Sequence, residues 1–224
     1  MISQPITERK LREVFNMLKA KYPNSRIQAS ALREEKKLEN NNRTLTYSFG
    51  EGTVISTERR LRRTDSFLIV GLGVFLVIEE VGKSGKAPLL TYPNPFQVGQ
   101  IAIDAAPVLP LVPPINAKDL NVIYNGTMNI TVNKNAQAES VDMQQFYNVP
   151  TTQENSINDL SEIAYGAGVI SMEPHIMLHG SLTNDLTIEF PSWPGIAIQS
   201  HKANWDAKVI VKPIGFLISG VSGQ

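Results

Sequence analysis

The pattern Glu173-x-His175-x-x-x-His179 comes nearest to a metal-ligand set in this sequence. On a helix, histidines four residues apart share one face and can bind the same ion. On a strand they lie roughly 13 Å apart, which is too far for one ion. Short alternating apolar segments surround the pattern, so we expect a strand here, and neither a metal site nor any other cofactor.

Signatures of other catalytic sites are missing from the sequence. It contains no nucleophile elbow, phosphate-binding loop or dinucleotide-binding fingerprint, and no cysteine that could act as a nucleophile. Glu79 and Glu80 are adjacent, so on a strand their carboxylates point to opposite faces and cannot act on one substrate. We therefore expect a protein that is not an enzyme.

The strongest charge cluster is the run Glu-Arg-Arg-Leu-Arg-Arg at residues 58–63. Guanidinium groups match phosphate oxygens, which would suit nucleic acid. The cluster is short, however, and no aromatic residues are interleaved with it to stack on bases. An ion-pair surface between subunits is the favoured interpretation, with nucleic-acid contact as the alternative. The residues concerned are Arg59, Arg60, Arg62 and Arg63.

Charge is divided unevenly along a chain that is neutral overall. Residues 1–63 carry 14 Lys and Arg against 7 Asp and Glu, and residues 64–224 carry the reverse. A basic N-terminal region joined to an acidic remainder indicates two surfaces that suit different partners, or that suit each other in a homo-oligomer.

Residues 7–22 show the periodicity of an amphipathic helix. Thr7 can cap its N-terminus, and Tyr22-Pro23 ends it. The apolar face suits packing within its own chain, packing against another subunit or, less favourably, contact with a membrane. That face consists of Leu11, Val14, Phe15 and Leu18. A second short helix is expected over residues 29–38.

From residue 44 onward the apolar pattern changes to period two. Short alternating segments bounded by Gly, Pro, Asn or Asp follow one another, most densely over residues 168–220. This pattern predicts a mainly β protein, an antiparallel, jelly-roll-like β-sandwich with an N-terminal amphipathic helix. We expect residues 1–43 to form a basic helical arm and residues 44–220 to form a sandwich domain that folds without it.

Three stretches of this domain carry more specific expectations. Asn125-Gly126 lies between two alternating runs and predicts a hairpin with a type I′ turn. Residues 101–114 are apolar but hold four prolines, which indicates an extended arm that covers the core or reaches a neighbour. Residues 134–161 are polar and predict a long surface loop.

A basic helical N-terminus, many short strands and proline-rich segments without a catalytic motif resemble virion structural proteins. More narrowly, the pattern is similar to the jelly-roll capsid-type proteins of bacterial viruses. The comparison is prompted by residues 59–63 leading into a strand at 65–70, by the Pro-Asn-Pro corner at 90–95, and by the strand pair within 172–190. The resemblance implies a subunit that forms an assembly, with a basic arm facing nucleic acid or the neighbouring subunit.

We therefore expect a structural subunit of a bacteriophage particle, either a capsid protein or a head or tail accessory protein, that self-assembles through its sandwich and arms. Its partners would be copies of itself, other virion proteins and nucleic acid. It would be made in the host cytoplasm and reside in the virion. The alternative is a carbohydrate-binding β-sandwich, such as a receptor-binding module, in which Trp193 and Trp205 line the sugar site.

Overall fold

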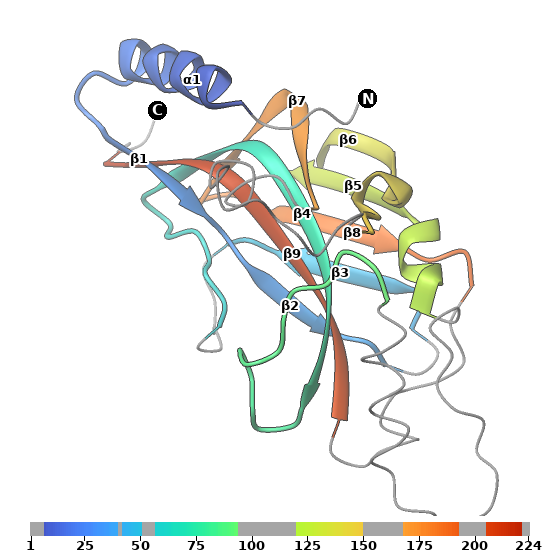
Figure 1. Cartoon of the computed structure of the whole chain (residues 1–224). Coiled ribbons are helices and arrows are strands. Elements are labelled where there is room, and N and C mark those ends of the chain that lie inside the picture. The colour runs from blue at the N-terminus through green and yellow to red at the C-terminus, as the bar shows by residue number, and fades with distance from the viewer. Residues whose placement is uncertain are drawn as a thin grey trace, which may run out of the picture.

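The computed structural model describes residues 7–39, 42–50, 57–93, 120–149, 168–192 and 205–220 of the 224-residue chain. The proline-rich residues 101–114 and Trp193 lie outside the described residues, so the expectations for them stay predictions. Figure 1 shows the elements, which are α1 (Glu8–Lys21), β1 (Arg26–Ala31), β2 (Glu34–Lys37), β3 (Thr44–Ser48), β4 (Ser66–Glu80), η1 (Asn121–Asn125), β5 (Thr127–Val132), β6 (Asn135–Asp142), η2 (Met143–Phe146), β7 (Val169–His179), β8 (Asn184–Glu189) and β9 (Trp205–Ser219).

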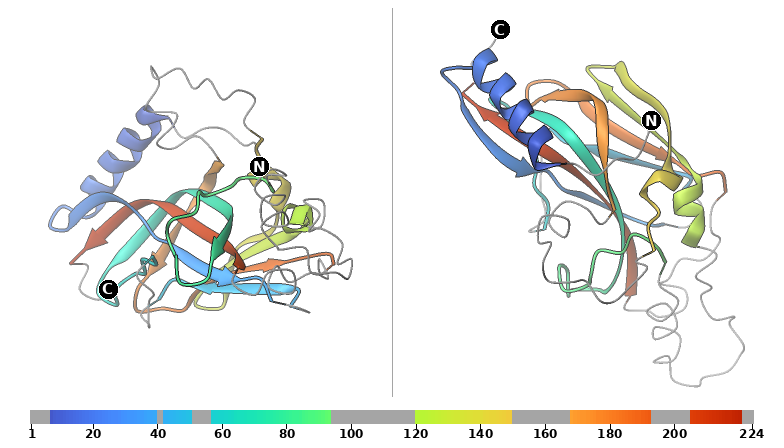
Figure 2. Two further views of the ribbon diagram at one scale, coloured as in Figure 1. Left: turned by 60° about the horizontal axis from the view of Figure 1, so that its bottom comes forward. Right: turned by 45° about the horizontal axis from the view of Figure 1, so that its top comes forward.

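Two antiparallel sheets pack face to face. The first has the strand order β1-β9-β4-β7, with β2 also paired to β9, and the second has the order β3-β8-β5-β6. Figure 2 shows the two sheets as separate layers, with α1 on the side of the first sheet that faces away from the second. The predicted antiparallel β-sandwich with an N-terminal helix is confirmed.

The strand pairs are nested in the manner of a jelly roll. From the ends of the fold inward, β1 pairs with β9, β3 with β8, β4 with β7, and β5 with β6. Rolling up this ribbon of antiparallel pairs brings β9 against β4 and β8 against β5. β1 and β2 occupy one position along β9, so each sheet has four strand positions. Two such sheets with this nesting make a jelly roll.

β4 and β9 form the centre of the first sheet. Each is 15 residues long, and every residue of β4 except Glu80 is buried. A register shift between Ile69 and Gly71 changes which residues face the second sheet, from Phe67 and Ile69 before it to Leu72 after it. Such a bulge inserts one extra residue into a strand. Because the apolar alternation before the bulge is out of step with the alternation after it, the sequence pattern of this one strand looks like that of two strands.

Helix α1 begins and ends where the sequence predicts. The hydroxyl of Thr7 accepts a hydrogen bond from the N–H of Lys10, which satisfies one of the free donors at the N-terminus. At the other end, the N–H of Tyr22 donates to the carbonyl of Leu18. Within the described residues, no helix has the length and apolar character needed to cross a membrane.

The apolar face of α1 packs on the outer face of the first sheet. Val14 and Leu18 are buried there, and Leu11 and Phe15 are partly buried. The ring of Phe15 lies 5.9 Å from that of Phe216 on β9, measured between centroids. The four residues that the sequence offers for contact with another subunit therefore contact their own chain instead. The periodicity locates an apolar face, but what covers that face depends on tertiary structure.

The expected helix over residues 29–38 and the domain boundary at residue 43 are wrong. β1 and β2 run antiparallel to β9 and form backbone hydrogen bonds with it. Without β1 and β2, the backbone N–H and C=O groups along one edge of β9 would have no hydrogen-bond partners. The need to satisfy these groups outweighs the helix propensity of Glu34 to Lys37. Residues 26–37 are therefore part of the sandwich, and the arm is reduced to α1.

The predicted hairpin is also displaced. The turn between β5 and β6 lies at Asn133-Lys134, whose φ angles of 51° and 66° are both positive, as a type I′ turn requires. Asn125 instead ends the 3-10 helix η1. Gly126 is required by close packing, because a Cβ there would lie 2.3 Å from the carbonyl oxygen of Glu189.

The polar stretch over residues 134–161 begins with regular structure rather than a loop. β6 covers Asn135–Asp142 and η2 covers Met143–Phe146, with Met143 and Phe146 buried in the core. Polar and small residues suit β6 because it is an edge strand with one face toward solvent. The loop prediction is therefore wrong over residues 135–146, and residues 150–161 lie outside the described residues.

Two N-terminal truncations should have different outcomes. Deleting residues 1–24 removes only the helix and uncovers the apolar outer face, so we expect a folded sandwich of lower stability. Deleting residues 1–43 also removes β1 and β2 and takes Leu32 and Leu38 from the core, so we expect an unfolded or aggregated product. Far-UV circular dichroism and thermal unfolding would check this. Two equally well-folded products would contradict it.

Candidate functional site

Residues 57–63 run along one side of the sandwich and connect its two sheets. Arg59 forms a β-bridge with Arg33, which lies between β1 and β2, through reciprocal backbone hydrogen bonds of 2.8 and 2.9 Å. The N–H of Leu61 donates to the carbonyl of Phe49, which follows β3 of the second sheet. The side chain of Leu61 is buried in the core between the sheets. The arginine run is thus built into the body of the sandwich.

A cleft of about 620 Å³ lies between this segment and the first strand. Along β1, Ile27 and Ala31 belong to the outer apolar cluster under α1, so the alternating Arg26, Gln28 and Ser30 face the other way, into the cleft. We call this feature the basic cleft. Its charged lining consists of Arg26, Glu58, Arg59, Arg60, Arg62 and Asp65.

The structure separates the four predicted arginines into two groups. Arg59, Arg62 and Arg63 are exposed, and the first two line the basic cleft. Arg60 is only partly exposed. Its charge is compensated within the chain, because its Nη2 atom lies 3.4 Å from carboxylate oxygens of both Glu34 and Glu58. Three of the arginines are therefore available to a partner, and Arg60 is part of the internal structure.

Arg26 is a member of the cleft that the sequence reasoning missed. It lies on β1, more than thirty positions before Arg59 in the sequence, and is exposed. The signal that would have found it is the alternation over residues 26–31, in which polar side chains take turns with apolar or small ones. An amphipathic strand there brings Arg26 to the same face as the cleft.

Beneath the basic cleft lies a fully buried carboxylate. Glu34, at the start of β2, is 0% exposed, and its Oε1 atom lies 3.1 Å from Nζ of Lys36 and 3.4 Å from Nη2 of Arg60. Its other carboxylate oxygen has no hydrogen-bond partner. Burial raises the pKa of Glu34, and the charges of Lys36 and Arg60 reduce this shift without cancelling it.

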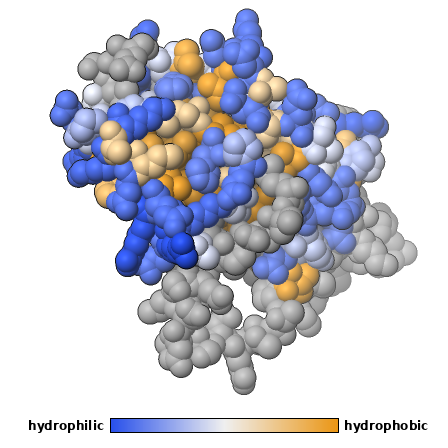
Figure 3. All heavy atoms as spheres, turned by 90° about the horizontal axis from the view of Figure 1, so that it is seen from above, coloured by the Kyte–Doolittle hydropathy of each residue, from blue (hydrophilic) through white to orange (hydrophobic). Residues whose placement is uncertain are grey.

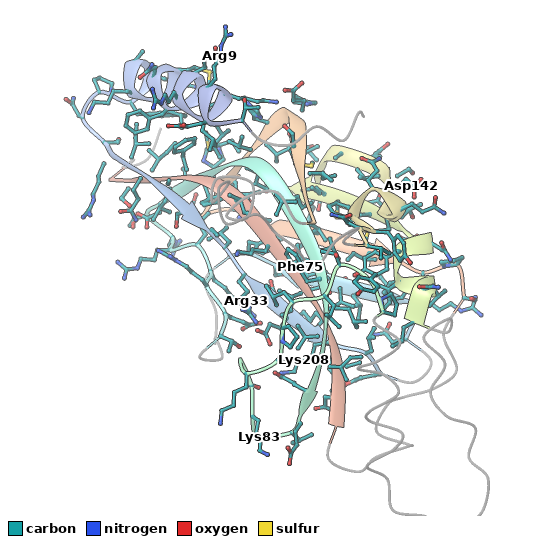
Figure 4. All side chains as sticks on the ribbon, viewed as in Figure 1. Arg9, Arg33, Phe75, Lys83, Asp142 and Lys208 are labelled. Carbon is teal, nitrogen blue, oxygen red and sulfur yellow. The ribbon has the colours of Figure 1, made fainter. Side chains whose placement is uncertain are left out.

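A second set of ion pairs lies on the outer face of the same strands (Figure 4). Arg33 is 2.6 Å from Glu35, and Lys208 on β9 contacts both Glu35 and Glu79. Burial disfavours the charged form of Glu79, but the hydrogen bond and charge of Lys208 outweigh it and hold the pKa of Glu79 below its ordinary value. These pairs connect β2, β9 and β4.

The histidines lie on a strand, as the sequence predicts, and each has a partner in the protein. The Nδ1 atom of His175 is 2.8 Å from the carbonyl oxygen of Met172, and that of His179 is 3.1 Å from the hydroxyl of Ser66. Among the residues that the structure describes, no group of three or more His, Asp or Glu is arranged to hold a metal ion. Trp205 begins β9, and Trp193 is not among the described residues.

No protein-family model, curated protein or solved structure matches this chain. The class of the protein is therefore defined by its own fold, a jelly-roll β-sandwich with a helix across one outer face. The feature that distinguishes its surface is the basic cleft beside β1.

Replacing Arg60 with Ala should destabilise the fold. The change leaves the buried carboxylate of Glu34 with Lys36 as its remaining cation, and we expect the free energy of unfolding to fall by about 3 kcal/mol. The exposed Arg63 is the matched control, and Arg63→Ala should stay within about 0.5 kcal/mol of the parent protein. Urea denaturation measures both. Equal stability of the two variants would show that Arg60 has no internal role.

Glu34 should make stability depend on pH. Its pKa is raised on folding, so the folded state holds this proton at higher pH than the unfolded state does. The contribution of Glu34 to the free energy of unfolding therefore falls as the pH rises from its ordinary pKa of 4.5 to its raised pKa in the folded state. Above that raised pKa the contribution is constant. Glu34→Gln cannot titrate, so its stability relative to the parent should increase across that window. Urea denaturation at a series of pH values tests this, and a difference that is constant or declines with pH would contradict it.

Proposed function

We propose that this chain is a non-enzymatic structural subunit of a bacteriophage particle, a capsid protein or a head or tail accessory protein, that assembles with copies of itself. The observation that carries the proposal is the jelly-roll strand order, an architecture used by viral capsid proteins and by lectins and cupins. The restriction to bacterial viruses rests on the sequence resemblance. The virion as its location, its synthesis in the host cytoplasm and contact with other virion proteins follow from the same proposal.

The edges of the two sheets support an assembly role. Among the described residues, four of the five edge strands have features that hinder pairing with another chain. β2 has four residues, β3 has five, β6 has an irregular register with β5, and β7 contains Pro174. β1 has none of these features and pairs with β9 in continuous register over six residues. The basic cleft lies beside this regular edge, which makes it the best-formed contact surface of the described residues.

Charge supports the same proposal. The basic residues concentrate in the first 63 positions, while the rest of the chain is acidic, and the total is neutral. A subunit of this kind can neutralise its surface by contact with copies of itself. The exposed Arg59, Arg62 and Arg63 also allow contact with nucleic acid as a secondary role.

Light scattering coupled to size-exclusion chromatography tests the proposal. We expect the purified chain to form species whose mass is a multiple of 24.7 kDa, and negative-stain images of the largest species to show rings, capsomers or shells. A monomer of 24.7 kDa at every concentration would contradict it. Binding of a monomer to a glycan array would then support the carbohydrate-binding alternative.

A further inference from the structure

The edge of the sandwich opposite the basic cleft is acidic. β1 and β2 form the edge of the first sheet on the side where β2 contacts β3, and β6 ends the second sheet at the edge away from β3. Figure 4 shows Asp142, at the end of β6, to the right of Arg33, which lies beside β2. Glu139 and Asp142 on this strand are exposed. Within the described residues, neither forms an ion pair with Lys or Arg.

The sequence around β6 excludes cations over a long stretch. Residues 135–201 hold eight Asp and Glu and no Lys or Arg, and β6, β7 and β8 all fall within it. On β7, Glu173 forms an ion pair with Lys10 of α1, so its charge is compensated within the chain. Glu139 and Asp142 are left as the acidic pair of an exposed edge strand, which we call the acidic edge.

The cleft has the complementary chemistry. Arg26, Arg59 and Arg62 are exposed in its lining, whereas Arg60 is compensated by Glu34 and Glu58. Its floor includes the apolar Leu61 and Leu217. A concave surface with an apolar floor and a basic rim suits a strand that carries small residues and carboxylates.

We infer that the basic cleft of one copy receives the acidic edge of a second copy of this chain, an interface that rests on the proposed self-assembly. The two surfaces lie on opposite sides of the molecule, so one copy cannot bring them together within itself. The contact is therefore heterologous, and a bound pair keeps one free acidic edge on one copy and one free cleft on the other. Repetition of such a contact builds closed rings or open chains rather than isolated symmetric dimers.

A second copy fits the cleft better than nucleic acid does. No aromatic side chain lines it that could stack on bases. The matching partner, by contrast, is present on every copy of the chain.

Two charge variants and their mixture test the interface. The cleft variant carries Arg59→Glu and Arg62→Glu, and the edge variant carries Glu139→Lys and Asp142→Asn. The Asn keeps an oxygen that can accept the N–H of Gln144, as Asp142 does. A control with Lys83→Glu and Lys86→Glu makes the same change in charge as the cleft variant at the exposed turn after β4. Circular dichroism confirms the fold of each protein.

Sedimentation equilibrium on all four proteins gives the outcome. Like charges facing each other at an interface cost several kcal/mol, so the dissociation constant of each interface variant should rise about a hundredfold, and the control should match the parent. Each interface variant keeps one intact surface, so an equimolar mixture should form a heterodimer with the parental affinity. Raised salt should weaken association of the parent.

Several results would overturn the inferred interface. The experiment distinguishes them from results that would contradict the proposed structural role. Assembly that persists in both interface variants would place the contact elsewhere and leave the structural role standing. Weak association of the mixture would show a symmetric contact rather than a head-to-tail one. A parent protein that is monomeric throughout would contradict both the interface and the structural role. Loss of nucleic-acid binding without loss of self-association in the cleft variant would assign the cleft to nucleic acid.

Discussion

The pairing of β4 with β9 is the constraint on which the rest of this structure depends. Both strands have 15 residues and pair from Ser66 to Glu80, so together they span the whole sandwich. Close approach is secured by Gly215, where a Cβ would lie 1.8 Å from the carbonyl oxygen of Leu68. Because both faces of this pair are apolar, each needs a cover. The second sheet covers one face, and α1 covers part of the other. Figure 3, which views the molecule from above, shows apolar side chains at the surface among charged ones.

The same pair explains the position of the basic cleft. β9 changes partner from β1 to β2 near Pro213, whose carbonyl accepts the N–H of Leu32 at 2.9 Å. Proline has no N–H, so a break in the neighbouring strand at this point leaves no donor unsatisfied. Arg33, next to the break, turns to pair with Arg59. The break therefore draws the arginine run against the edge of the first sheet, and the cleft forms between that run and β1.

Local patterns predicted what depends on local structure, and the rest depends on contacts between distant residues. Period-two alternation predicted the sandwich, and the apolar spacing after Thr7 predicted α1. The strand at Glu34 to Lys37 could not be predicted locally, because its residues favour a helix and only the edge of β9 makes them extended.

The same distinction holds for the site. The arginine run is visible as a charge cluster, but the division between exposed Arg59 and inward Arg60 is set by Glu34, which lies 26 positions earlier in the sequence. The hairpin at Asn133-Lys134 was missed because Asn-Gly is the stronger turn signal, although Gly126 serves close packing instead.

The most direct test of the assembly account is a cryo-electron microscopy reconstruction of the largest species that the purified chain forms. The account predicts that every repeated contact places β1 and residues 57–63 of one copy against β6 of the next, with Arg59 and Arg62 facing Glu139 and Asp142. A contact in which β1 meets β1 across a two-fold axis, or a particle held together by other surfaces with the basic cleft open to solvent, would contradict it.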